Sequence, residues 1–323
     1  MTSTIDNIFM LRHGYYILKL LRPRQWIKNF ALFAGVTFAG KLFELDLLAQ
    51  VVSGFIAFCM FASATYIFND ILDVKKDRLH PFKKMRPIAS GIISVPEAVV
   101  LLILILTAAF VIALNTSYLF TVIAISYILL QILYSTVFKS ITIFDILFIA
   151  TGYILRILAG EAISNFHTSI WLLLTAVSLS LFLAVGKRRS ELTLLQNVKG
   201  AKIDEVRKTL SHYSEALLDS FSTIFATSTF VFYGLFTFLA TPKGLHIGLD
   251  VLLPEYLPTY FNRKWLMVTI IPVIYGVMRY LQDIYEKKEG ESPDKVLLTD
   301  KPLLASVIIW GFLVIFIIYF IGG

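Results

Sequence analysis

The chain has 323 residues, of which 57% are hydrophobic and 16% charged, and 29 lysines and arginines exceed 22 aspartates and glutamates to give a net charge of +7. This composition excludes an ordinary soluble domain, which would carry more charge and fewer long apolar stretches, and it predicts an integral membrane protein. The single cysteine excludes a disulfide framework, and the five histidines lack the paired spacing of a zinc or iron site.

The N-terminal segment, residues 1–25, combines apolar side chains with four basic residues, Arg12, Lys19, Arg22 and Arg24. A signal peptide would have an uninterrupted hydrophobic core, so this mixture favours an amphipathic helix that lies on the membrane surface. No later stretch has the composition of a soluble domain. We therefore expect one membrane domain over residues 1–323.

Hydropathy predicts nine membrane spans in the rest of the chain. Leu, Ile, Val and Phe fill them without strict alternation, which favours helices over a transmembrane barrel. The expected fold is an all-α, polytopic bundle. The predicted spans are 26–43, 48–69, 96–114, 118–138, 143–163, 169–186, 217–240, 265–282 and 303–321.

The distribution of basic residues predicts the orientation of the bundle. With nine spans, 24 of the 29 lysines and arginines fall on the side of the N-terminus, 4 fall on the opposite side, and Arg156 lies inside a span. Because basic loops stay in the cytoplasm, we expect a cytoplasmic N-terminus. The positive charge is then a one-sided field that contacts anionic lipid, and we expect no nucleic-acid partner.

A cluster of acids follows the second predicted span, in the stretch "NDILDVKKDRLHPFKKMRPIASG" from Asn69 to Gly91. Asp70, Asp73 and Asp77 are spaced i, i+3 and i+7, so a helix places them on one face. Three carboxylates at one point repel each other unless a cation neutralises them.

Hard oxygen ligands at this density suit Mg²⁺. We predict a magnesium site formed by Asn69, Asp70, Asp73 and Asp77. The alternative is a solvated helix end, balanced by Lys75, Lys76 and Arg78.

Basic residues gather on the same predicted side of the membrane. Lys83 and Arg86 follow the acids in a loop that two prolines restrict. Further bases stand at the ends of other predicted helices: Lys28, Lys139, Lys187, Arg188 and Arg189. Carboxylates with a metal, surrounded by lysines and arginines, suit a diphosphate leaving group. We predict that the acids hold metal and the bases hold phosphate.

The pattern "NDxxDxxxD" over 69–77, followed by "RPIASG" over 86–91, resembles the first signature of the UbiA superfamily of intramembrane prenyltransferases. Four stretches are most similar to the bacterial phosphoribosyltransferase branch of that superfamily: "RPRQWIKN" (22–29), "DRLHPFKKMRPIASG" (77–91), "YILRILAG" (153–160) and "LFLAVGKRRSEL" (181–192). Where aromatic prenyltransferases carry a second acidic motif, this chain reads "GKRRSEL", a basic sequence that either binds an additional phosphate or serves only as a topological anchor.

The resemblance implies a UbiA-type bundle of nine helices in the bacterial plasma membrane, with an active site that faces the cytoplasm. It implies Mg²⁺-dependent transfer of 5-phosphoribose from phosphoribosyl diphosphate to a polyprenyl phosphate, releasing diphosphate, for the synthesis of arabinofuranosyl lipid donors. A homo-oligomer is compatible with it. The implied catalytic residues are Asp73, Asp77, Lys83 and Arg86. The implied substrate contacts are Lys28, Asn29, Asn69, Arg78, Tyr134, Lys139, Arg156, Lys187, Arg188 and Arg189.

Two of these residues have structural alternatives. An arginine inside an apolar span indicates a functional site by default, but Arg156 could instead form a structural ion pair with Asp145 or Glu161. Tyr134 could be an ordinary interfacial aromatic residue.

Two other functions compete with the phosphoribosyltransferase. The first is an intramembrane aromatic prenyltransferase that uses an isoprenyl diphosphate, against which the missing second acidic motif argues. The second is a transporter, although the sequence shows no internal repeat and its acids lie at one face of the membrane.

Overall fold

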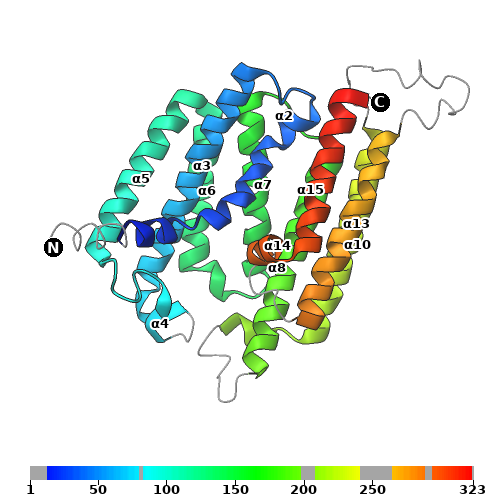
Figure 1. Cartoon of the computed structure of the whole chain (residues 1–323). Coiled ribbons are helices and arrows are strands. Elements are labelled where there is room, and N and C mark those ends of the chain that lie inside the picture. Colours follow the sequence, from blue (N-terminus) through cyan, green and yellow to red (C-terminus); the bar gives the residue numbers. More distant parts are fainter. Residues whose placement is uncertain (1–12, 80–82, 198–207, 241–263, 288–292, 322–323) are drawn as a thin grey trace, which may run out of the picture.

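The computed structural model describes residues 13–79, 83–197, 208–240, 264–287 and 293–321. This part of the chain is entirely helical and contains no strand (Figure 1). Eight helices in it are long and apolar enough to cross a membrane. They are α3 (Leu45–Leu72), α5 (Val95–Thr116), α6 (Tyr118–Thr136), α7 (Phe144–Ser164), α8 (Ile170–Asn197), α10 (Glu215–Leu239), the run Trp265–Glu286 around α13 (Ile270–Gln282), and α15 (Lys301–Phe316) with η7 (Ile317–Ile321). The prediction of an all-α, multi-pass membrane protein is confirmed.

The first predicted span, 26–43, is not one of these eight. Its residues form a 3-10 helix, η1 (Pro23–Phe33), and a short α-helix, α2 (Ala34–Phe38). At about 2.0 Å per residue in a 3-10 helix and about 1.5 Å in an α-helix, the 11 and 5 residues together extend about 30 Å, the thickness of a hydrocarbon core. A ninth span therefore stays a prediction.

Two hydrogen bonds fix η1 against α3. The indole nitrogen of Trp26 donates to Ser63 Oγ at 3.0 Å, and Asn29 Nδ2 donates to Cys59 Sγ at 3.2 Å. In Figure 1 this segment rises from the N-terminal helix to α2, beside α3 and α7, against both of which η1 packs.

Glycine permits the closest contact of η1 with α7. A Cβ atom at Gly160 would lie 1.9 Å from the carbonyl oxygen of Leu32, inside van der Waals contact. The sequence spacing of Gly152 and Gly160 is compatible with close helix packing, and Gly160 provides it.

The remaining helices pack mainly against their neighbours in sequence. α3 lies beside α5, α6 beside α7, α7 beside α8, α8 beside α10, and α13 beside α15. The short helix α14 (Pro293–Thr299) contacts both η1 and α8. η3 (Phe138–Ser140) contacts η4 (Lys208–His212), and α4 (Val74–Leu79) follows α3 at the lower end of the bundle in Figure 1.

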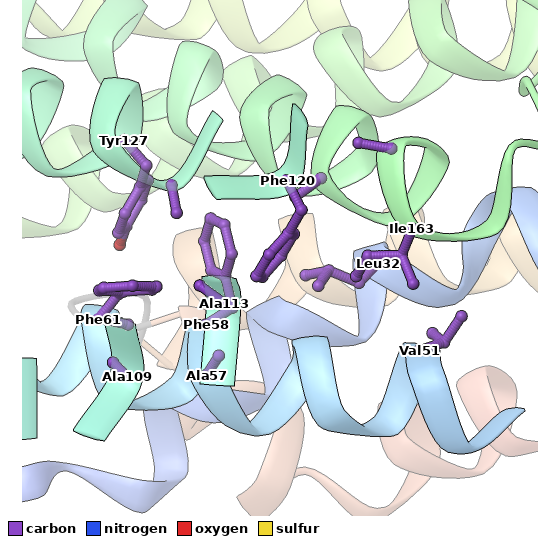
Figure 2. Packing of buried hydrophobic residues seen from close by; sticks show 14 of the residues in the cluster. Leu32, Val51, Ala57, Phe58, Phe61, Ala109, Ala113, Phe120, Tyr127 and Ile163 are labelled. Carbon is purple, nitrogen blue, oxygen red and sulfur yellow. The ribbon is translucent and has the colours of Figure 1, made fainter. Parts of the chain in front are cut away.

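The largest buried apolar cluster joins α3 to η1, α5, α6 and α7. Phe58 stands between Phe120 and Tyr127, with ring centroids 6.3 and 4.7 Å away (Figure 2). On the outer surface, α5 exposes Val100, Ile103 and Leu104. A helix that is apolar on both faces suits hydrocarbon surroundings.

The N-terminal segment is described from His13 onward. Leu20 is buried while Tyr15 and Leu18 are exposed, and His13 Nε2 lies 2.5 Å from Glu97 Oε1 at the start of α5. Contact of this segment with the membrane surface stays a prediction, as does a single domain over the whole chain.

Candidate functional site

The two outer aspartates of the acid cluster share one arginine. Asp70 and Asp77 are only 2% and 4% exposed. Arg86 Nη1 donates to Asp70 Oδ1 at 3.0 Å and to Asp77 Oδ2 at 2.6 Å. Arg22 Nη2 donates to Asp70 Oδ1 at 2.5 Å. The alternative of a solvated helix end is therefore wrong for both acids, whose bases are Arg22, which precedes η1, and Arg86, in the loop that follows α4.

The middle aspartate turns to a different partner. α3 ends at Leu72, and Asp73 follows it with φ −92° and ψ 5°, outside regular helix geometry. Lys139 Nζ, on η3, donates to both carboxylate oxygens of Asp73 at 2.8 and 2.9 Å. The expectation that all three acids aim at one point from one helical face is thus corrected. In the described residues, no group of three or more His, Cys, Asp or Glu side chains is close enough to hold a metal ion.

The other predicted residues of this stretch lie on α3, α4 and η2. Asn69 is half-buried on the last turn of α3, and Lys83 is half-buried on η2 (Lys83–Met85). Arg78 Nε donates to the carbonyl oxygen of Ala89 at 3.2 Å. This bond holds the "RPIASG" turn, which ends at Gly91 with φ +80°, a conformation that glycine adopts without strain.

Arg156 is buried in α7 and is held by neutral groups. Its Nε donates to Asn29 Oδ1 at 2.8 Å, Nη1 to the Gly152 carbonyl at 2.7 Å, and Nη2 to the Tyr127 hydroxyl at 2.9 Å. Its guanidinium also lies over the Tyr127, Tyr153 and Phe58 rings, at 4.9, 5.5 and 5.8 Å.

The structural ion pair weighed for Arg156 is not formed. Asp145 is the partner of Arg188, and Glu161 accepts hydrogen bonds from the main-chain nitrogen and hydroxyl of Thr168. Arg156 is therefore a buried cation in the middle of a span, and its recorded hydrogen bonds all go to neutral groups.

Lys28 and Lys187 approach the same region from η1 and α8. Lys28 Nζ donates to Gln25 Oε1 at 2.5 Å. The half-buried Lys187 lies within electrostatic range of Tyr134, Glu191 and Lys28. The first base of "GKRRSEL" thus lies near Tyr134 and Glu191, within electrostatic range of Lys28.

Arg188, the next base, is fully buried in a network of side chains. It donates to Asp145 Oδ2 at 2.7 Å, to Glu191 Oε2 at 2.7 Å, and to the Tyr134 hydroxyl at 3.4 Å. The half-buried Tyr134 thus has a specific partner beyond that of an ordinary interfacial aromatic residue.

Tyr213 extends this network to the segment after η4. Its hydroxyl donates to Asp145 Oδ1 at 2.8 Å and accepts the main-chain N–H of Ile143 at 2.7 Å. Burial, together with the neighbouring Asp145 carboxylate, raises the pKa of Tyr213, so the hydroxyl stays protonated and can donate.

Arg189 points to the other side of α8. It donates to Asp219 Oδ1 at 2.9 Å and to Glu215 Oε2 at 2.8 Å, both on α10. Because Arg188 and Arg189 are each neutralised by two carboxylates, their contacts favour a role in fixing α8 against α7 and α10. Their direct contact with substrate stays a prediction.

Three residues of these networks were not among the predicted site residues. Arg22 lies within "RPRQWIKN", and its φ of 53° turns the chain into η1 toward Asp70. Asp145 is an acid inside an apolar span, and that position is itself a signal of function. From the sequence, Asp145 was expected only as a possible partner of Arg156. Tyr213 stands between the predicted spans 169–186 and 217–240, and nothing in its sequence surroundings distinguishes it.

Comparison with known proteins gives consistent results. Residues 29–298 match the model of the UbiA prenyltransferase family. The chain is 33% identical over 312 residues to the decaprenyl-phosphate phosphoribosyltransferase of Corynebacterium glutamicum, covering 94% of this chain and 86% of that protein. It is 34% identical over 298 residues to the enzyme of the same name from Mycolicibacterium smegmatis, covering 91% and 89%. Among solved structures, a UbiA homologue from Archaeoglobus fulgidus bound to GPP and Mg²⁺ is similar with a TM-score of 0.65 and 21% identity, over 93% of this chain and 99% of that one.

Proposed function

Because the chain belongs to the UbiA prenyltransferase family and is a transferase, we propose that it moves the 5-phosphoribosyl group of phosphoribosyl diphosphate to a polyprenyl phosphate and releases diphosphate. The names of the two bacterial relatives support this reaction, since the likeness to each covers about nine tenths of this chain. The observation that carries the proposal is the arrangement of the acids, each of which binds a base from another segment of the chain.

The donor's diphosphate and its metal are proposed to bind at Asn69, Asp70, Asp73 and Asp77, which requires Asp73 to leave Lys139 and turn toward the other two acids. Their oxygens are the ligand type that Mg²⁺ prefers, and the homologous A. fulgidus structure was solved with Mg²⁺. In the structure the three carboxylates neutralise bases. When bound, the ion would stabilise the negative charge of the departing diphosphate.

The bases around the acids then serve the phosphates. Arg86 and Lys139 already lie within hydrogen-bond distance of the acids, so they can turn to a diphosphate that binds there. Lys83 is proposed to neutralise charge as the bond from ribose C1 to the diphosphate breaks.

The acceptor phosphate is an anion at neutral pH, so it can attack C1 without a general base, and positioning carries the reaction. The remaining substrate contacts proposed for this chain are Lys28, Asn29, Arg78, Tyr134, Arg156, Lys187, Arg188 and Arg189.

We further propose that the protein lies in a bacterial plasma membrane with this site toward the cytoplasm, as the excess of basic residues on one side indicates. Its lipid-linked product would supply the synthesis of arabinofuranosyl donors. A homo-oligomer is compatible with the arrangement.

A transfer assay tests the reaction directly. Purified protein in detergent receives Mg²⁺, labelled phosphoribosyl diphosphate and a polyprenyl phosphate, and label is followed into the organic phase. Asp73→Asn is expected to lower the rate on the order of a hundredfold. The matched control is Asp46→Asn, which removes an exposed acid at the opposite end of the same helix and is expected to leave the rate unchanged. Absence of label in the lipid, with prenylation of an aromatic acid from an isoprenyl diphosphate instead, would contradict the proposal.

A further inference from the structure

The turn between α6 and α7 contains a strained residue. Ile143, the residue before α7, has φ +71° and ψ −48°, close to the classic γ-turn, which is rare and strained. Of the three non-glycine residues with a positive φ in the described chain, Arg22 and Asn165 have left-handed helical geometry, whereas Ile143 does not. For a β-branched residue such a conformation persists only when the surrounding structure imposes it.

The side chain of Ile143 does not impose this conformation, because it is 49% exposed. The main chain of the turn is held by Tyr213. Its hydroxyl accepts the N–H of Ile143 at 2.7 Å and donates to Asp145 Oδ1 at 2.8 Å. Tyr213 is 4% exposed, and hydrogen bonds inside a protein are stronger than those in water. One hydroxyl therefore ties the residue before α7 to an acid in its first turn.

The position of this hydroxyl is set by packing outside the turn. Tyr213 follows η4, which contacts η3, and its ring belongs to the same buried apolar cluster as Ile146 and Ala150 of α7. The other oxygen of Asp145 accepts from Arg188 Nε of α8 at 2.7 Å. Because both the ring and the acid are fixed by other helices, the turn adapts to the hydroxyl.

The same turn carries Lys139, four residues before Ile143. Lys139 lies on η3, and its Nζ donates to both carboxylate oxygens of Asp73. Return of Ile143 to an ordinary helical φ of about −60° would rotate the main chain between η3 and α7 by about 130°. Since α6 and α7 are held by their own packing, the short η3 would have to absorb that rotation, and Lys139 would move away from Asp73.

We propose that Tyr213 is a positioning residue, which keeps Ile143 in its strained conformation and thereby places Lys139 beside the acids of the site. This inference rests on the proposed function, in which Lys139 turns to the diphosphate of the donor. Tyr213 acts through the main chain of the turn and needs no contact with the substrate.

Binding of inorganic diphosphate in the presence of Mg²⁺ tests the proposal without turnover. Isothermal titration calorimetry of the purified protein in detergent measures it. Tyr213→Phe removes the hydroxyl and keeps the ring, and it is expected to weaken diphosphate binding roughly tenfold, the loss of one charge-assisted hydrogen bond from Lys139. In a Lys139→Gln background, Tyr213→Phe should cause no further loss, because the hydroxyl acts through that lysine. An equal loss in both backgrounds would overturn the proposal.

A glycine substitution tests the strain itself. Glycine adopts a positive φ without strain, so Ile143→Gly should recover about threefold or more of the affinity that Tyr213→Phe loses. A tyrosine that only stabilises the fold predicts no recovery, and that result would overturn the proposal.

Ile143→Pro breaks the same contact from the other side, because proline fixes φ near −65° and has no N–H. It should weaken diphosphate binding as Tyr213→Phe does, and it keeps the test decisive if Tyr213→Phe does not fold. Wild-type affinity in Ile143→Pro would count against the strained turn.

Tyr319→Phe is the matched control. The Tyr319 hydroxyl also accepts a main-chain N–H, from Leu42 at 2.8 Å, and donates to the Thr37 carbonyl at 3.0 Å. These contacts lie beside α2, at the opposite end of the bundle from α4 (Figure 1). Tyr319→Phe should bind diphosphate like the wild type.

The transfer assay separates this inference from the proposed function. In Tyr213→Phe the KM for phosphoribosyl diphosphate should rise about tenfold, while the KM for polyprenyl phosphate stays unchanged. If the wild type transfers label but Tyr213→Phe keeps its donor KM, only the positioning role fails. If the wild type binds diphosphate through the coupled pair of Tyr213 and Lys139 but transfers no label, only the proposed function fails.

Discussion

The contact of Gly160 with η1 gives a sharp test of how packing controls the site. Gly160→Ala would place a Cβ atom 1.9 Å from the Leu32 carbonyl oxygen, whereas Cβ contacts under 3.0 Å are essentially never formed. Because the obstacle is main chain, no side-chain rotation relieves it, and η1 must move away from α7 by about 1.1 Å. Asn29 and Arg156 lie in the same interface, one helical turn earlier on each segment. Their 2.8 Å hydrogen bond then lengthens toward about 3.9 Å, too far to be retained.

The expected cost follows from these two effects. Overpacking a close contact costs about 1–3 kcal/mol, and loss of a hydrogen bond to a charged group costs about 1.5–3 kcal/mol. The better helix propensity of alanine returns up to about 1 kcal/mol. The free energy of unfolding should therefore fall on the order of 2–5 kcal/mol, and transferase activity should fall with it, since Arg156 loses the bond that orients its guanidinium.

Thermal unfolding of the purified protein in detergent measures this change, with the transfer assay run on the same samples. Gly234→Ala and Gly311→Ala are matched controls, because a Cβ atom at either helical position meets nothing within 4 Å. Both controls should unfold at the wild-type temperature or slightly above it. If Gly160→Ala unfolds as late as the controls and keeps full activity, the close contact of α7 with η1 does not exist in the protein.

Three further predictions concern charges. Asp145→Asn leaves Arg188 with one carboxylate partner, so thermal unfolding should show a loss of about 3 kcal/mol; an unchanged midpoint would contradict the buried network. Arg22→Gln removes a cation beside Asp70, so the KM for the donor should rise about tenfold. The control Arg24→Gln removes an exposed base two residues later and should leave the KM unchanged. Equal KM values for the two variants would exclude a role for Arg22. Removal of metal with EDTA should stop transfer and returned Mg²⁺ should restore it, and full activity in EDTA would refute the magnesium site.

The fold was predictable where hydropathy decides it. The predicted spans 48–69, 96–114 and 143–163 correspond to α3, α5 and α7, although α3 is three residues longer than predicted at each end, running from Leu45 to Leu72. The segment 26–43 differs, since a nearly continuous apolar stretch does not distinguish 3.0 from 3.6 residues per turn. The 3-10 geometry of η1 depends on contacts with α3 and α7 that are distant in the sequence.

The candidate site was predictable in its residue types more than in its pairings. The acids and most of the bases follow from their spacing and from the ends of the predicted spans. Which base binds which acid does not, because Lys139 and Asp73 are 66 residues apart. The neutral surroundings of Arg156 also depend on η1 and α6, which supply Asn29 and Tyr127.

The 3-10 geometry of η1 has a consequence for how a charged substrate could travel. With three residues per turn, side chains three positions apart stand in line along the helix. Trp26 and Asn29 thus form one straight row toward α3, while Gln25 and Lys28 stand in a second row. An α-helix would wind both rows around its axis. As it stands, η1 presents Gln25 and Lys28 to an anion as one straight polar row along the helix.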